Sequence, residues 1–368
     1  MTMGSKRGRG LRSLFILAAL SLTAPLTAQT AAVRQTSLAP TALSVLALDA
    51  VQTIQALSAG DYELSLSGAL NTGTLAKISR ALIANEGVRV SLNLSAVSGL
   101  AVIAAGAFAD CTNLVSITLP DSTTKVQAAA FSGCTNLAAI VATEASERFS
   151  SRDGLLYNKA GDTLLVCPPA LHGTVSLESD VSALSPDAFT LSADVSAFTV
   201  AAENPAFTAR DGCIYSKDLA TLVRCAPARE EAVTVAAGVS AIAAHAFDGC
   251  TKLTAIVLPA SVTEIGELAF ANCRALTSLT LPPQLVSIGK QAFFGCAALQ
   301  ELTVPASTTS VGSRAFYHCA LTTLAFAQSD GWHYGRKSAS DLADSSANPE
   351  KFAFPGRYWP YDLYRSNE

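Results

Sequence analysis

Nine cysteines are the residues of this 368-residue chain best suited to do chemistry. Thiols form disulfides in exported proteins and bind zinc when they come in Cys-x-x-Cys pairs. The chain has no such pair, and six of its cysteines each follow a phenylalanine by three residues. We expect a column of buried thiols that pack as small hydrophobic side chains, with disulfides between adjacent repeats as the alternative and no metal site. The six are Cys111, Cys134, Cys250, Cys273, Cys296 and Cys319.

The other residue types that serve catalysis show no useful pattern. His245 and His318 fall at variable positions beside an Ala-Phe pair, where we expect surface side chains. Acidic residues are scattered, and no pair recurs in register as the carboxylates of a glycosidase would. The sequence therefore predicts a protein that is not an enzyme, with no catalytic, cofactor-binding or metal-binding residues and no cofactor.

The six cysteines recur at the same position of a 23-residue repeat. The Ala-Phe pair recurs at Phe108, Phe131, Phe189, Phe247, Phe270, Phe293 and Phe316, at intervals of 23, 58, 58, 23, 23 and 23. Five residues before each of these phenylalanines lies a hydrophobic residue such as Ile265 or Ile288, and a small residue usually follows it. Repeats of this length cannot bury their own apolar side chains and must stack on one another.

Alternating segments such as "LTSLTLP" and "LQELTVP" predict a short half-buried strand in each repeat, ended by proline. The fold class that follows is a repeat solenoid of the leucine-rich type, with short parallel strands and an irregular convex side. Each phenylalanine should then occupy the same interior position in successive coils.

Two inserts explain the 58-residue intervals. "SSRDGLLYNKAGDTLLVC" and "TARDGCIYSKDLATLVRC" each combine an Asp-Gly turn, a β-prone run, a polar turn and a second β-prone run. This order predicts a β-hairpin in each, near residues 144–170 and 203–228. Cys167 and Cys225 hold the same place in the two inserts. Cys213 takes the place of Leu155, which favours packing over chemistry.

The two ends differ from the repeats. Residues 1–28 combine a basic start with the apolar run "LFILAALSLTA", which predicts a cleaved secretory signal peptide and no membrane span afterwards. Residues 29–87 are expected to form a small α/β cap, with helical spacing over 41–59 and 74–86 before strand-like segments. The solenoid would cover 88–326, and the aromatic-rich residues 327–368 would form a C-terminal cap or tail.

Composition restricts the partners. Charged residues make up 15% of the chain, and the net charge is −4 at a pI of about 5.6. This balance does not favour nucleic acid or other polyanions as partners.

The repeat "LTSLTLPPQLVSIGKQAFFGC" and its sister copies resemble the BspA-like leucine-rich-repeat family of bacterial secreted and surface proteins. The inserts resemble the spacers that such proteins carry between repeats. The resemblance covers about residues 88–326, and it departs at Ser192, where the pattern has cysteine. It implies a solenoid located at the bacterial cell surface, in the periplasm or outside the cell, which binds proteins or host matrix, often as an adhesin.

The surface that remains for function is the outward face of the strands. Small, neutral and hydroxyl-bearing side chains are expected there, and they could form a docking face for a protein or a glycan. A structural envelope protein without a soluble ligand is one alternative, and a carbohydrate-active enzyme on a β-solenoid is another. The candidate contacts are Ser116, Thr118, Thr199, Ser278, Thr280, Glu301, Thr303 and Thr323 on the strands and Trp332, Tyr334, Tyr358 and Trp359 in the tail.

Overall fold

The protein is described by a computed structural model that covers residues 39–328, 332–335 and 362–365. All of these except Ala39 belong to one compact unit, residues 40–368. The expected signal peptide, residues 1–28, lies outside the described residues. None of the helices in the described ranges is long and apolar enough to cross a membrane.

Strands and helices alternate at the start of the described chain. Parallel strands need a crossover between them, and helices supply it here. Three neighbouring strands pair in parallel, with Leu43 opposite Leu64 and Leu64 opposite Leu92. The elements are β1 (Thr41–Leu46), α1 (Ala50–Ala56), β2 (Gly60–Ala69), α2 (Thr72–Ala84) and β3 (Val88–Ser98).

The helical spacing expected over 41–59 is wrong for its first part. Residues 41–46 form β1 at the edge of the sheet, and only Ala50–Ala56 are α-helical. The segment "TALSVL" also alternates with period two, so both periods fit so short a stretch. Pairing with β2 selects the strand, because it supplies hydrogen-bond partners for the backbone groups along one edge of β1. In the second segment the helix covers Thr72–Ala84.

The same sheet continues into the first repeats. β3 pairs with β5 (Leu114–Thr118), which pairs with β7 (Ala139–Val141), so the sheet order is β1-β2-β3-β5-β7. On another side of these coils β4 (Val102–Ile103) pairs with β6 (Lys125–Val126), followed by a 3-10 turn at Ala128–Phe131.

Each insert holds three antiparallel strands. The two strands on either side of the polar turn are those that the sequence predicts. The strand before each Asp-Gly was not predicted. The last strand of each insert then pairs in parallel with the next coil, which joins the insert to the stack. The elements are β8 (Phe149–Arg152), β9 (Leu155–Asn158) and β10 (Thr163–Val166), then β14 (Phe207–Arg210), β15 (Cys213–Ser216) and β16 (Thr221–Cys225).

One coil lies between the inserts. It contributes β12 (Ala183–Leu184), which pairs with β10, and β13 (Val195–Val200), which pairs with β11 (Gly173–Leu177). Ser192 of this coil donates a hydrogen bond to the Cys167 carbonyl, 2.9 Å away. A hydroxyl therefore replaces the thiol without leaving a buried polar group unsatisfied.

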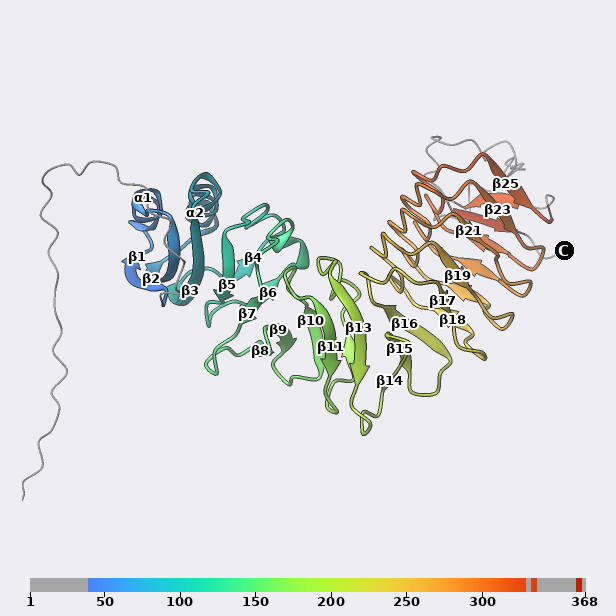
Figure 1. The fold of residues 1–368 in the computed structure, drawn as a ribbon, viewed down its shortest axis with the longest axis horizontal. Coiled ribbons are helices and arrows are strands. Elements are labelled where there is room, and N and C mark those ends of the chain that lie inside the picture. Colours follow the sequence, from blue (N-terminus) through green and yellow to red (C-terminus); the bar gives the residue numbers. More distant parts are fainter. Residues whose placement is uncertain (1–38, 329–331, 336–361, 366–368) are drawn as a thin grey trace, which may run out of the picture. The chain divides into compact units, whose positions relative to one another are not determined.

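The last four coils form a regular stack, which Figure 1 shows at the C-terminal end of the ribbon. One side of the stack is a parallel ladder in which Ile242, Ile265, Ile288 and Val311 lie directly opposite one another, as the repeat predicts. The strands on this side are β18 (Ala241–Ile242), β20 (Glu264–Ile265), β22 (Ser287–Ile288) and β24 (Ser310–Val311).

The other side of the stack carries the strands whose outward face was predicted to bind. They form two separate parallel ladders and not one. The first contains β17 (Val233–Thr234), β19 (Ala255–Val257) and β21 (Ser278–Leu279), and the second contains β23 (Glu301–Val304) and β25 (Thr323–Phe326).

Phenylalanine rings fill the space between the two sides, as the repeat predicts. The ring centroids of Phe247 and Phe270 lie 5.1 Å apart, those of Phe270 and Phe293 5.1 Å, and those of Phe293 and Phe316 5.6 Å. Phe108 and Phe131 stack in the same way at 5.9 Å. Identical side chains therefore lie over one another in two rows, which belong to separate core clusters. Phe189, in the coil between the rows, departs from the expectation and instead meets Phe198 edge-on, with ring centroids 4.8 Å apart.

A column of small residues allows the coils to approach closely. A Cβ atom at Gly289 would lie 2.4 Å from the carbonyl carbon of Gly266 in the preceding coil, and one at Gly312 would lie 2.3 Å from the nitrogen of Lys290. These distances are too short for any side chain. The glycines in this column are therefore required by contact between backbones.

The C-terminal edge of the stack is covered by a strand from the tail. β27 (Asp362–Arg365) pairs antiparallel with β24 and also with β26 (Trp332–Gly335). An unpaired edge strand offers a template for other chains, and β27 occupies that edge of β24.

Candidate partner-binding face

The predicted face residues point outward, but they do not form one continuous sheet. Ser116 and Thr118 lie half-buried in β5, and Thr199 is exposed on β13. The other five are exposed on or beside β21, β23 and β25. Only this last set lies on neighbouring coils of one regular stack: Ser278, Thr280, Glu301, Thr303 and Thr323.

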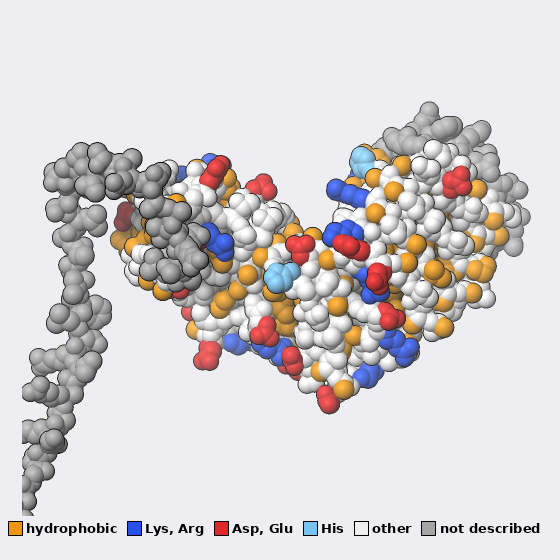
Figure 2. Space-filling model, in the orientation of Figure 1, with side chains coloured by type: hydrophobic (Ala, Val, Ile, Leu, Met, Phe, Trp, Pro, Cys, Tyr) orange, Lys and Arg blue, Asp and Glu red, His pale blue; other side chains and the backbone are white. Residues whose placement is uncertain are grey.

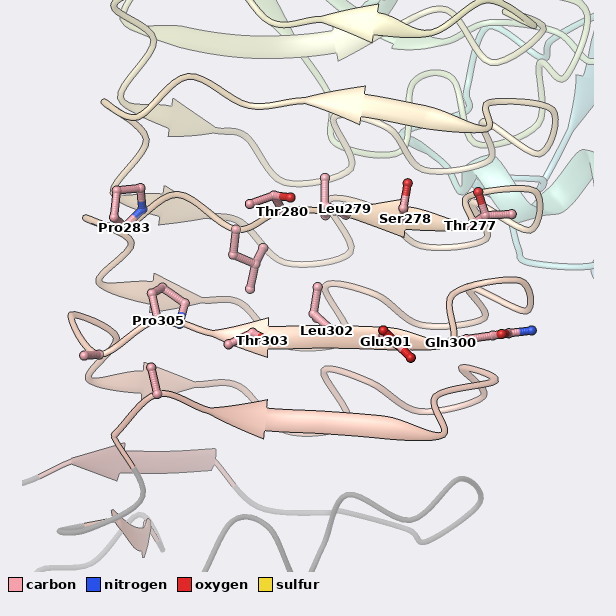
Figure 3. Close-up of a pocket in the computed structure, with 13 residues that line it drawn as sticks. Thr277, Ser278, Leu279, Thr280, Pro283, Gln300, Glu301, Leu302, Thr303 and Pro305 are labelled. Atoms are coloured by element: carbon pink, nitrogen blue, oxygen red, sulfur yellow. The ribbon is translucent and has the colours of Figure 1, made fainter.

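A groove of about 730 Å³ runs between β21 and β23. Figure 3 shows the two strands along its length, with Ser278 and Thr280 on one and Glu301 and Thr303 on the other. Leu279 and Leu302 contribute to its lining, and prolines close one end. A smaller hollow of about 320 Å³ lies beside it, between β19 and β21.

The groove coincides with an interruption of the sheet. β21 pairs with β19 and β23 pairs with β25, but β21 and β23 have no ladder between them. Pro283 stands where the neighbouring coils have Ala260 and Ala306, and it has no N–H group to donate. It also lines the groove. The repeat pattern does not predict this interruption, although the second proline, Pro283, is a visible departure from it.

The backbone of β23 presents hydrogen-bonding groups to the groove. The carbonyl groups of Gln300 and Val304 accept hydrogen bonds from the β25 side, from the amides of Thr322, Thr323 and Ala327. Backbone groups of successive strand residues point to alternate sides. The N–H and C=O groups of Glu301 and Thr303 therefore point toward β21, where no ladder receives them.

The side chains that line the groove are mostly neutral. Within the described part of the chain, Ser278, Thr280, Glu301 and Thr303 make no side-chain hydrogen bond to the protein. Glu301 is the one ionisable residue of the lining. In Figure 2 the visible surface over this part of the chain is mostly uncharged or hydrophobic. The groove can therefore offer hydroxyl and backbone groups to a ligand, with little net charge.

The tail residues divide into two groups. Trp332 and Tyr334 belong to β26, whose backbone pairs with β27. Tyr358 and Trp359 lie outside the described residues. The role of these four as partner contacts remains a prediction.

The cysteine column is buried, and its thiols donate hydrogen bonds. The Sγ atom of Cys273 lies 3.2 Å from the Phe247 carbonyl oxygen of the preceding coil, and that of Cys296 lies 3.1 Å from the Phe270 oxygen. Burial is the main cause that raises the pKa of Cys134 to about 12. The structure holds all nine cysteines as free, buried thiols, which favours packing over disulfides between repeats.

One predicted surface residue is instead largely buried. The side chain of His245 is 12% exposed, and its Nδ1 atom lies 2.9 Å from the Asp248 carboxylate. Its neighbour Arg224 is buried and donates hydrogen bonds to the carbonyl groups of His245, Phe189 and Asp248. The Arg224 contacts explain the position of His245, because the guanidinium holds the turn that carries it. Such contacts between distant residues leave no signal in a 23-residue repeat.

The described residues contain no group of three His, Cys, Asp or Glu side chains that could hold a metal ion. What this part of the chain presents to solvent is a groove lined by hydroxyls, backbone groups and apolar side chains.

Several solved structures of bacterial leucine-rich-repeat proteins are similar to the chain. The pneumococcal vaccine antigen PcpA is 18% identical, with 72% of this chain and 62% of that chain covered and a TM-score of 0.46. A leucine-rich-repeat protein of Eubacterium ventriosum is 20% identical, with 72% and 80% covered and a TM-score of 0.47. A leucine-rich cell surface protein of Faecalibacterium prausnitzii is 19% identical, with 78% and 93% covered and a TM-score of 0.40.

The chain thus spans less than two thirds of the length of the pneumococcal antigen. No curated protein matches it. The family model described as "BspA type Leucine rich repeat region" matches six copies, over residues 90–152 and 229–330. The unmatched stretch between them contains the first insert from Asp153 onward, the coil with Ser192 and the second insert. In these two stretches, the chain carries leucine-rich repeats of the BspA type.

Proposed function

We propose that the protein is exported and that its strand face binds an extended segment of a partner protein in the groove between β21 and β23. The observation that carries this proposal is the interruption of the sheet at the groove. β21 and β23 lie on adjacent coils with Cα atoms within 8 Å of each other, closer than the roughly 9.5 Å that an added strand between them would need. The partner segment would therefore lie over the groove and form hydrogen bonds with the hydroxyl and backbone groups that line it.

A polypeptide partner fits the groove better than a glycan does. The exposed hydroxyl groups of Ser278, Thr280 and Thr303 are neutral donors and acceptors that can pair with the peptide groups of a partner. The lining contains no aromatic ring, although small-molecule sites are commonly lined by hydrophobic and aromatic side chains. We therefore propose that the groove binds a partner.

The location outside the cytoplasm rests on the sequence of residues 1–28. Their basic start and short apolar run are typical of a secretory signal peptide. The name of one similar structure describes a cell surface protein, and that of another describes a vaccine antigen. An adhesin-like role at the surface of a bacterium is therefore our proposal, and amino-terminal sequencing of the exported protein would test the cleavage near Ala28.

Binding arrays test the groove directly. The full chain would be applied to an array of overlapping peptides from extracellular-matrix proteins and, in parallel, to a glycan array. We expect binding to a subset of peptides and its loss in the Thr303→Arg variant, because the arginine would fill the groove. Thr251→Arg is the matched control, since Thr251 is also exposed in the stack but lies outside the groove.

The possible outcomes separate the alternatives. Binding to glycans alone would contradict the polypeptide assignment. Binding that Thr303→Arg and Thr251→Arg reduce equally would place the contact elsewhere. A chain that binds neither array would favour the structural envelope role.

A further inference from the structure

Two cysteines of the second insert lie opposite each other. Cys213 on β15 and Cys225 on β16 are direct partners in the antiparallel ladder, and both are fully buried. Their Sγ atoms lie 2.6 Å apart. This is far closer than the roughly 3.5–4.0 Å of an ordinary non-bonded contact between heavy atoms and near the about 2.05 Å of a disulfide bond.

The backbone around the pair also fits a cross-strand disulfide. The amide of Cys225 donates to the Ala246 carbonyl oxygen, 2.7 Å away, and not to Cys213. The two residues therefore lack the double hydrogen bond of a hydrogen-bonded pair. In the other kind of antiparallel pair the Cα atoms lie about 4.5 Å apart, within the usual range of disulfides.

These two thiols differ from the seven others. Each of the seven lies within hydrogen-bonding distance of a backbone carbonyl oxygen, as Cys296 does with Phe270 and Cys250 does with Ala226. Within the described residues, Cys213 and Cys225 have only sulfur partners: each other, and Cys250 beside Cys225. The first insert provides an internal comparison, because Leu155 replaces Cys213 there and Cys167 has no thiol opposite it.

We propose that Cys213 and Cys225 form a disulfide bond when the chain folds under oxidising conditions, a covalent link between the two final strands of the second insert. A disulfide-containing oxidant supplies the chemistry. One thiolate attacks the oxidant and forms a mixed disulfide, and the second thiolate displaces the remaining thiol. Two protons and two electrons leave the cysteines, and the oxidant is reduced to two thiols.

The disulfide should form before the second insert has folded and buried both sulfur atoms. Hydrogen bonding to Cys213 and Cys250, together with burial, raises the pKa of Cys225 well above its ordinary value. A thiol in this state is a poor nucleophile, because the thiolate is the reactive form. Both sulfurs are also inaccessible in the folded chain. Oxidation during folding is therefore the productive route, and the proposal does not depend on the function assigned to the groove.

Tryptic digestion can identify the pair because each of the three neighbouring cysteines falls on its own peptide. Cleavage after Arg210, Lys217, Arg224, Arg229 and Lys252 puts Cys213 in 211–217, Cys225 in 225–229 and Cys250 in 230–252. The full chain would be refolded with reduced and oxidised glutathione, alkylated without reduction, digested and analysed by mass spectrometry.

We expect peptide 211–217 to be linked to peptide 225–229, with peptide 230–252 alkylated. Linkage of 225–229 to 230–252, or alkylation of all three, would overturn the proposal. Two variants serve as controls. Cys250→Ser, which copies Ser192, should keep the link. Cys213→Leu, which copies Leu155, should lose it.

Thermal unfolding gives a second readout, which compares each protein with itself in the presence and absence of a reductant. A reductant should lower the unfolding temperature of the oxidised wild type, because the cross-link restrains the unfolded chain. The same reductant should leave Cys213→Leu unchanged. Equal shifts in both proteins would also overturn the assignment.

Discussion

The rings of Phe270 and Phe293 lie parallel on adjacent coils, with an interplanar angle of 0° and centroids 5.1 Å apart. Both side chains are fully buried. Each ring packs face to face against the rings of the coils before and after it, so every coil in the row is stabilised by its two neighbours.

Replacing Phe270 by alanine should therefore destabilise the chain by about 3–5 kcal/mol, because a large cavity would open in the middle of the row. Urea unfolding measures the change. Phe294 is the matched control, since it lies next to Phe293 in sequence but is only partly buried, against Tyr317 and His318. A loss in Phe294→Ala as large as that in Phe270→Ala would contradict the role of the row.

Gly289 should not tolerate even a methyl group. Its Cβ would lie 2.4 Å from the backbone of Gly266, so the coils would have to separate. We expect Gly289→Ala to lower the free energy of unfolding by about 1–3 kcal/mol, the usual effect of overpacking. Gly73→Ala, in α2, is the control, because the nearest atom to its Cβ would be the end of the Asn71 side chain at 3.3 Å. A neutral Gly289→Ala would show that the coils are not in backbone contact.

Alkaline pH should destabilise the protein because it ionises buried tyrosine and cysteine side chains. Burial raises the pKa of Tyr157 from 10.0 to about 12, and that of Cys134 from 9.0 to about 12. The unfolded chain ionises at the lower values, so it releases protons that the folded chain keeps. The stability from these groups is complete below about pH 9 and is lost as the pH rises toward 12.

Tyr157→Phe tests this linkage without changing the packing, since no described residue hydrogen-bonds to the Tyr157 hydroxyl. Urea unfolding at several values between pH 8 and 11 should show a shallower loss of stability in this variant than in the wild type. The same slope in both proteins would show that Tyr157 titrates alike in the folded and unfolded chains.

The column of phenylalanines shows how far the sequence predicts the structure. A fixed spacing that recurs with the same residue types leaves stacking as the way to bury Phe247, Phe270 and Phe293 together. The pairing of Ile265 with Ile288 follows from the same spacing. The β-prone runs on either side of the polar turns likewise predicted two of the three strands in each insert.

What the sequence did not predict depends on contacts outside the repeat. Residues 41–46 fit a helix or a strand, and pairing with β2 decides. Cys213 faces Cys225 because the strands shift register between Ile214 and Tyr215, a local irregularity with no marker in the residues. The candidate face is split between sheets for a similar reason. The interruption between β21 and β23 depends on the packing of two adjacent coils, and Pro283 is the one departure in the sequence that indicates it.

Hydrogen exchange at single amides of β23 tests most directly whether the sheet is open at the groove. The amides of Glu301 and Thr303 point toward β21 without a ladder, whereas those of Leu302 and Val304 point toward β25. In the free protein, we expect Glu301 and Thr303 to exchange much faster than Leu302 and Val304, because exchange reports backbone hydrogen bonds. Equal protection of all four amides would contradict an open edge and, with it, the proposed binding site.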